Sequence, residues 1–111
     1  MVQVTFRRDS RQRLTSIFAS GHADAAPHGE DLVCAAVSAI LQAARLGLEE
    51  HVEASLEVDQ RSGNLSLRWP ESLRDDPALV AIVATAELAV GRIASQYPGY
   101  VRANAETEGA T

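Results

Sequence analysis

The stretch Asp31-Leu32-Val33-Cys34-Ala35-Ala36-Val37-Ser38-Ala39-Ile40-Leu41 decides the fold of this 111-residue chain. Its apolar residues recur at spacings of three and four, which places them on one face of an α-helix. The residues of this apolar face are Val33, Val37, Ile40, Leu41, Ala44 and Leu48. Asp31 is the predicted N-cap, because its carboxylate can accept a backbone N–H of the first turn, and Gly47 is the predicted end. The sequence therefore predicts a helix from about Asp31 to about Gly47.

Strands are predicted on both sides of this helix. Residues 2–7, 14–19, 52–59 and 65–69 are the segments in question, and apolar and polar residues alternate in them, least regularly in the second. A second helix is expected from Pro77 to about Gln96, with Asp76 as its N-cap. The order ββαββα predicts an α+β fold, in which both helices cover one face of an antiparallel sheet.

The length and composition favour a single small domain. We expect this domain to span residues 1–103, with a short final strand possible at Tyr100-Val101 and a polar, disordered tail at residues 104–111. A chain of this size can bury a core without disulfides or metal ions. The formal charge of −5 gives no electrostatic reason to expect nucleic acid as a partner.

The sequence also favours a cytoplasmic location. The chain begins without the basic and apolar regions of a secretory signal, and its longest apolar run, residues 78–86, is far shorter than the ~20 residues that span a bilayer. We therefore expect no membrane contact. The reducing cytoplasm would keep a thiol reduced.

Cys34 is the only cysteine in the chain. At about the third residue of the predicted helix, its thiol would lie near unpaired backbone N–H groups and the positive end of the helix dipole, which lower a thiol pKa. The alternative is a small buried apolar residue, a common role for cysteine. From its position alone, the two interpretations are equally well supported.

His22 is the preferred partner for this thiol. It follows Gly21 at the expected end of a strand, where a rigid scaffold can hold a base in a fixed position. His28 is the competing histidine, although it lies in the predicted loop Ala23–Glu30, and His51 is expected at the far end of the helix. Gly21 and Gly29 bracket the loop and would act as hinges of a mobile flap.

Two further polar residues accompany the candidate dyad. Asp31 would cap the helix and could also orient the histidine, whereas Ser38, one turn after Cys34, could bond the thiolate or simply its own helix. Cys34, His22 and His28 do not have a recognised zinc spacing, so we expect neither a metal ion nor a cofactor. Backbone N–H groups at the helix start would form an oxyanion hole.

The segments Gly21-His22-Ala23, Gly29 and 31–40 together resemble the signature of the ribosomal-processing cysteine protease family Prp. The element order, the length and Tyr97-Pro98 are similar to that family as well. The resemblance implies a bacterial cytoplasmic endopeptidase that works as a homodimer and removes the N-terminal extension of large-subunit ribosomal protein twenty-seven, cutting after a pair of phenylalanines. It also implies Cys34 as nucleophile, His22 as general base, and Asp31 and Ser38 as supporting residues.

Two other functions remain open. One is a non-catalytic module that binds a ribosomal protein or assists ribosome assembly. It would dimerise through the second helix, whose apolar residues extend nearly all the way round, and would attract a basic partner by its acidic surface. The other is a thiol-based redox sensor, which the absence of a resolving cysteine in the chain disfavours.

Overall fold

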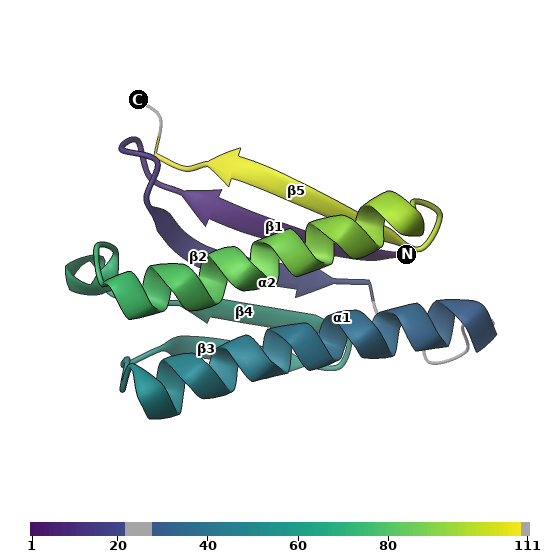
Figure 1. Cartoon of the computed structure of the whole chain (residues 1–111), viewed down its shortest axis with the longest axis horizontal. Coiled ribbons are helices and arrows are strands. Elements are labelled where there is room, and N and C mark those ends of the chain that lie inside the picture. Colours follow the sequence, from purple (N-terminus) through teal and green to yellow (C-terminus); the bar gives the residue numbers. More distant parts are fainter. Residues whose placement is uncertain (22–27, 110–111) are drawn as a thin grey trace.

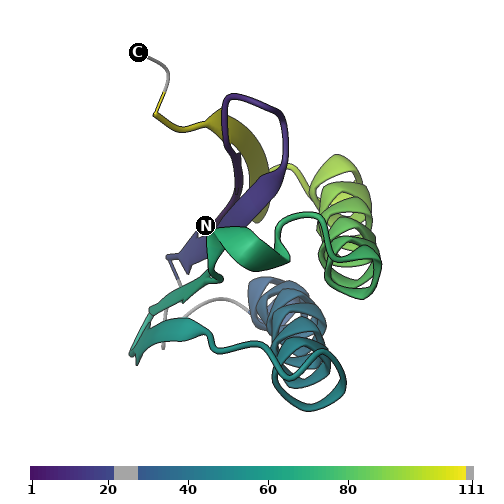
Figure 2. The same cartoon turned by 90° about the vertical axis from the view of Figure 1, so that its left-hand side faces the viewer.

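The computed structural model of the protein describes residues 1–21 and 28–109, and for residues 28–31 it describes the backbone only. The strands are β1 (Val2–Arg8), β2 (Leu14–Ser20), β3 (Glu57–Arg61), β4 (Asn64–Arg68) and β5 (Val101–Thr107). The helices are α1 (His28–Leu46) and α2 (Pro77–Gln96), with a π-helical turn at Gly47–His51 and a 3-10 turn at Glu71–Leu73. Both helices lie on the same face of the sheet (Figures 1 and 2), which confirms the predicted α+β class.

The sheet has the strand order β3-β4-β2-β1-β5. All neighbouring pairs are antiparallel except β1 and β5, which run parallel (Figure 1), so the expectation of a purely antiparallel sheet is wrong at this edge. The predicted tail is also wrong over residues 104–107, because they belong to β5. The short final strand considered at Tyr100-Val101 is in fact longer, and its full length was not predicted because the residues that share the face of Val101 are alanines, which mark the period-two alternation only weakly.

The first helix differs from its predicted bounds at both ends. It begins at His28 rather than Asp31, and the chain stays helical past Gly47 through the π-helical turn. The third strand then begins at Glu57, not at Val52. Residues 52–56 cannot extend it, since Glu53 has a φ of 59° and the N–H of Ala54 bonds the carbonyl of Leu48 instead.

The core lies between the two helices and the covered face of the sheet. The apolar face predicted for α1 is buried at Val33, Val37, Leu41 and Ala44, and that of α2 at Leu79, Val83, Ala86 and Val90. Trp69 is 2% exposed, and its indole N–H donates to the carbonyl of Leu14 at 2.9 Å, which satisfies its polar group. As predicted, Asp76 caps α2 by accepting the N–H of Leu79.

Two helical stretches, Leu32–His51 and Pro77–Gln96, have the length and composition of membrane spans. Each of them packs one side against the sheet, as Figure 2 shows for α1 and α2. Core helices of water-soluble proteins often have the same length and composition. These two helices are therefore only weak evidence for membrane insertion.

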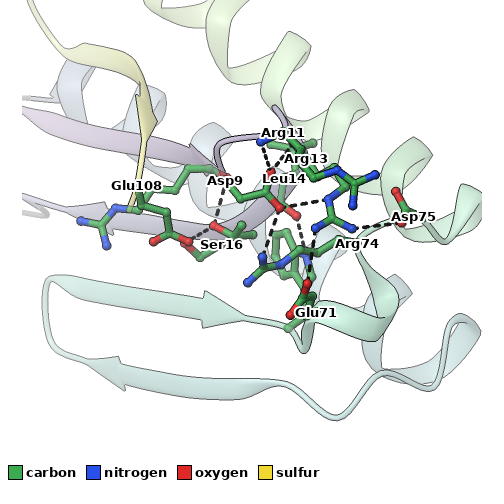
Figure 3. A network of polar contacts seen from close by, with 12 residues as sticks. Asp9, Arg11, Arg13, Leu14, Ser16, Glu71, Arg74, Asp75 and Glu108 are labelled. Carbon is green, nitrogen blue, oxygen red and sulfur yellow. Dashed lines mark hydrogen bonds and ion pairs between the residues drawn. The ribbon is translucent and has the colours of Figure 1, made fainter. Parts of the chain in front are cut away.

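A network of charged groups fixes the β1–β2 turn to the segment that precedes α2 (Figure 3). One carboxylate oxygen of Asp9 accepts the backbone N–H groups of Arg11 and Arg13, and the other accepts the Arg13 and Arg74 guanidinium groups at 3.0 and 3.1 Å. Arg13 also contacts Asp75 at 3.1 Å. Burial raises the pKa of Asp9, but the N–H donors and the Arg13 charge outweigh it, so the net pKa is lowered.

Candidate active site

A cavity of about 430 Å³ lies between α1 and one end of the sheet. The first helix contributes Cys34, Ala35, Val37, Ser38, Leu41 and Gln42 to its lining. The sheet contributes Val2, Ala19, Ser20, Gln60, Arg61, Gly63, Asn64 and Leu65. The cavity thus joins the candidate nucleophile to the β3–β4 hairpin and to the last residue of β2.

The floor of the cavity is a row of side chains from three adjacent strands. In the register of the sheet, Gln60 of β3 is paired with Leu65 of β4, and Leu65 with Ala19 of β2. Ala19 has the smallest side chain of this row, which leaves room beneath α1. The cavity therefore has an apolar floor, with the Gln60 amide at the outer edge of the sheet.

Cys34 is 6% exposed and lines this cavity. Because α1 begins at His28, Cys34 is its seventh residue and not its third, so it lies nearly two turns from the helix start. The dipole effect fades within the first turn, and the backbone N–H of an interior residue is bonded within the helix. The prediction that the helix start activates this thiol and offers an adjacent oxyanion hole is therefore wrong, and any activation has to come from another group.

The exit of β2 is held tightly next to the cavity. Gly21 has a φ of 99°, and its N–H donates to the carbonyl of Gly63 at 3.1 Å. A Cβ at this position would overlap the carbonyl oxygen of Met1, so only glycine fits. His22 follows directly and lies outside the described residues, so its predicted role as the base remains a prediction.

The other predicted site residues are placed only in part. Gly29 and Asp31 both lie inside α1, so Gly29 is not in a loop and Asp31 is not the N-cap. The Asp31 side chain lies outside the described residues. The catalytic and hinge roles of these two residues therefore stay predictions. His28 is the first helical residue. Ser38 is exposed and lines the cavity with Cys34. Cys34 and His51 are 17 positions apart, which corresponds to about 25 Å of helix, so His51 is far from the thiol.

Several polar residues of the cavity were missed by the sequence interpretation. Within residues 1–21 and 32–109, the side chains of Ser20, Ser38, Gln42 and Asn64 make no hydrogen bond to the protein. Gln60 differs, since its oxygen accepts the Arg45 guanidinium at 2.7 Å. The place of Asn64 beside Cys34 depends on the pairing of β2 with β4, for which no local signal in the sequence exists.

The same described residues contain no group of three histidine, cysteine, aspartate or glutamate side chains that could hold a metal ion. Among the described residues, the cavity combines a thiol with an apolar floor and several polar side chains that have no hydrogen-bond partner in this part of the chain. This combination suits a nucleophile that acts on a bound peptide.

The family model for the cysteine protease Prp matches residues 1–102 of this chain. A ribosomal processing cysteine protease Prp of Bacillus subtilis is 36% identical over 75 residues, which are 66% of this chain and 67% of that protein. The Prp of Staphylococcus aureus is 27% identical over 107 residues, which are 94% and 98% of the two chains.

Solved structures show the same fold. A crystal structure of a protein from Streptococcus mutans has a TM-score of 0.84 at 28% identity, and covers 97% of this chain and 96% of its own. The S. aureus Prp in complex with a substrate peptide has a TM-score of 0.84 at 21% identity, covering 95% and 99%. With a family match across almost the whole length and a thiol that lines a cavity at the end of the sheet, this chain belongs to the ribosomal processing cysteine protease family Prp.

Proposed function

We propose that this protein is the endopeptidase that removes the N-terminal extension of large-subunit ribosomal protein twenty-seven, with Cys34 as nucleophile and His22 as general base. The observation that carries the proposal is the shared lining of the cavity. Cys34 and Ser20 both line it, and Ser20 precedes His22 by two positions in the chain. Gly21, which lies between these two residues in the chain, is anchored by the hydrogen bond from its N–H to the carbonyl of Gly63.

In the proposed reaction, the Cys34 thiol gives its proton to the His22 imidazole, and the resulting thiolate attacks the scissile carbonyl carbon. When the tetrahedral intermediate collapses, the C–N bond breaks and the imidazolium protonates the leaving amine. His22 then takes a proton from water, and the hydroxide attacks the thioester. The C–S bond of the tetrahedral intermediate then breaks and releases the new carboxyl group, and the His22 imidazolium returns its proton to the Cys34 thiolate.

The form of the cavity supports a peptide substrate. The apolar floor formed by Val2, Ala19 and Leu65 can receive an apolar side chain, and the unpaired polar groups around it can bond a peptide backbone. The related S. aureus enzyme has been crystallised with a substrate peptide and with a covalently linked product peptide. Phenylalanine side chains before the cut site agree with such a floor.

Supporting residues and surroundings complete the proposal. Ser38 lies on the cavity wall and would hydrogen-bond the substrate or the thiolate, and Asp31 would orient the dyad. Because residues 28–30 belong to α1, the flap would consist of residues 23–27 and would cover the bound peptide from its hinge at Gly21. The enzyme would act in the bacterial cytoplasm, without cofactor, membrane or direct nucleic-acid contact.

The enzyme would also be a homodimer that associates through α2. Two apolar side chains of this helix are exposed, Leu88 at 76% and Val80 at 38%. A second copy of the chain would cover these side chains.

The test uses intact-mass spectrometry of the host's precursor of ribosomal protein twenty-seven. The precursor is incubated with the wild type, with Cys34→Ala and with His22→Ala. Loss of a discrete N-terminal peptide with the wild type alone supports the proposal and gives the cut site. An unchanged mass with a folded wild type, together with binding of the precursor, would instead favour the non-catalytic ribosomal-protein-binding module.

A further inference from the structure

The last strand, β5 (Val101–Thr107), lies at one edge of the sheet. Within the part of the chain that the structure describes, β5 has β1 on one side and no strand on the other. β5 is seven residues long and is one of the two edge strands of the sheet. Of residues 100–108, only Val101, Asn104 and Glu108 are not fully exposed. An open edge of this length presents backbone N–H and C=O groups that a further strand can bond.

The backbone hydrogen bonds show which groups of β5 point outward. The N–H of Val2 donates to the carbonyl of Tyr100 at 2.9 Å, and the N–H of Glu108 donates to the carbonyl of Arg8 at 2.7 Å. The even-numbered residues of this segment therefore direct their backbone groups toward β1. Because these groups alternate along a strand, those of Ala103 and Ala105 point away from the sheet.

One antiparallel register satisfies these outward groups and pairs opposite charges as well. If two copies of β5 meet about a twofold axis at Asn104, Ala103 of each copy lies opposite Ala105 of the other, so the outward groups bond each other. Arg102 of each copy then lies opposite Glu106 of the other. Opposite charges at directly facing positions stabilise a strand pair, and the closest side chains belong to such non-hydrogen-bonded pairs.

Arg102 has no ion pair within residues 1–21 and 32–109, whereas Glu106 has one, with Arg7 at 3.2 Å. Glu106 remains 57% exposed, so it can accept a second guanidinium. Among the described residues, Arg102 on β5 is therefore left without a charged partner, and the twofold register supplies one.

The covered face of the sheet gives a second reason for this arrangement. The neighbours of Ala103 and Ala105 on β1, Val4 and Phe6, are almost fully buried, whereas the two alanines on the same face are exposed. Glu87 of α2 bonds Arg8 at 2.7 Å, so the side of α2 that carries Glu87 faces the β1–β5 edge. A second copy at this edge would cover the alanines and bring the two α2 helices alongside each other.

The other edge strand is less suited to self-pairing. Two copies of β3 centred on Asp59 would place the carboxylates of that residue opposite each other, and like charges at facing positions are unfavourable. Moreover, Gln60 and Arg61 at the end of β3 line the cavity beside Cys34. A dimer through β3 would therefore obstruct the entry of substrate.

We propose that two copies of this chain join β5 to β5 in antiparallel fashion about Asn104, forming one continuous sheet with α2 beside its counterpart. This inference rests on the proposed homodimer and specifies how it is built. It places the two Cys34 cavities, which lie toward the β3 side of each sheet, away from the shared edge. The facing pairs of Arg102 and Glu106 set the register.

A cysteine cross-link tests the twofold axis directly. In a Cys34→Ala background, Asn104→Cys would be the only thiol, and facing Cα atoms about 4.5 Å apart lie within the range of a disulfide. Mild oxidation should convert most of this variant to a covalent dimer, as seen on a non-reducing gel. The matched control is Cys34→Ala with Asp59→Cys at the centre of β3, which should remain monomeric on the gel.

Charge reversal tests the register independently. Arg102→Glu should raise the dimer dissociation constant about tenfold or more in sedimentation equilibrium, Glu106→Arg should do the same, and the double variant should restore most of the affinity. Circular dichroism checks that each variant is folded. A solution dimer that neither cross-links at position 104 nor responds to charge reversal overturns the β5 interface and leaves the homodimer intact. A monomeric wild type overturns both, whereas precursor cleavage is measured separately by mass.

Discussion

The N–H of Gly21 and the carbonyl of Gly63 are joined by a hydrogen bond of 3.1 Å that ties the exit of β2 to the β3–β4 turn. Both Gly63 and Ser20, the residue before Gly21, line the cavity beside Cys34. This bond therefore fixes the point at which the chain continues toward His22. The geometry of the proposed dyad depends on a backbone contact as well as on the two side chains.

Gly21→Ala should destabilise the protein by about 1–3 kcal/mol and reduce cleavage more strongly than stability alone explains. A side chain here meets both the positive φ of 99° and the carbonyl of Met1. Urea unfolding and precursor cleavage measure the two effects. Gly99→Ala is the matched control, since a Cβ there meets nothing within 4 Å and no positive φ is involved. Equal behaviour of the two variants would contradict this role of Gly21.

The reactivity of Cys34 should depend on His22 and not on the helix start. The rate of alkylation by iodoacetamide is expected to remain high well below pH 8 in the wild type, because an imidazolium beside a thiol favours the thiolate. In His22→Ala, the rate should follow a pKa near about 8.5, the ordinary value for cysteine. His51→Ala, at the far end of the helical segment, should match the wild type. Identical profiles in all three proteins would refute the dyad.

Ala19→Leu should fill the cavity from its floor and exclude the substrate side chain. Ala19 lies between Val4 and Leu65 in the sheet, so a larger residue projects toward α1. We expect kcat/KM for the precursor to fall about tenfold or more, while iodoacetamide, which is small, still reaches Cys34. Ser66→Leu adds a similar side chain on the opposite face of the sheet and should leave kcat/KM near that of the wild type. A normal kcat/KM for Ala19→Leu would show that the substrate side chain binds elsewhere.

Asp9 should contribute to stability at neutral pH and lose this contribution in acid. Its folded-state pKa is lowered by hydrogen bonds from Arg11 and Arg13 and by the Arg13 charge, against the opposing effect of burial. The stabilisation is therefore fully present above the unfolded-state pKa and disappears as the pH falls through the folded-state value. Asp9→Asn should lower Tm by several degrees at pH 7 and flatten its acid dependence. In thermal melts, Asp59→Asn should change Tm much less, because Asp59 is exposed and its ion pair with Arg61 at 3.0 Å is exposed as well.

The parts of the fold that follow local rules could be predicted from the sequence. The first two strands have apolar alternation, and α2 has both Asp76 as its cap and Pro77 at its first position. The start of α1 could not be predicted, because Pro27 and Gly29 favour a loop, and the helix includes Gly29 all the same. The predicted capping role of Asp31 was lost with that boundary.

The site was predictable in its residues but not in its surroundings. Cys34 and Ser38 were identified from their sequence context, and both line the cavity. The hairpin residues beside them were not, because Asn64 reaches Ser20 only through the pairing of β2 with β4. The Asp9 network was missed for the same reason, as it joins residues 65 positions apart.

The parallel pairing of β1 with β5 has a consequence for how the protein reaches its native state. Val2 pairs with Val101, and Arg8 with Thr107. The first strand therefore cannot complete its pairing until the last strand has been synthesised. While the chain is still being made, β1 and β2 can form their hairpin, but the opposite side of β1 remains exposed. Contacts so distant along the chain have a high entropic cost of closure and slow folding. We therefore expect the complete sheet to form only after residue 107 has left the ribosome.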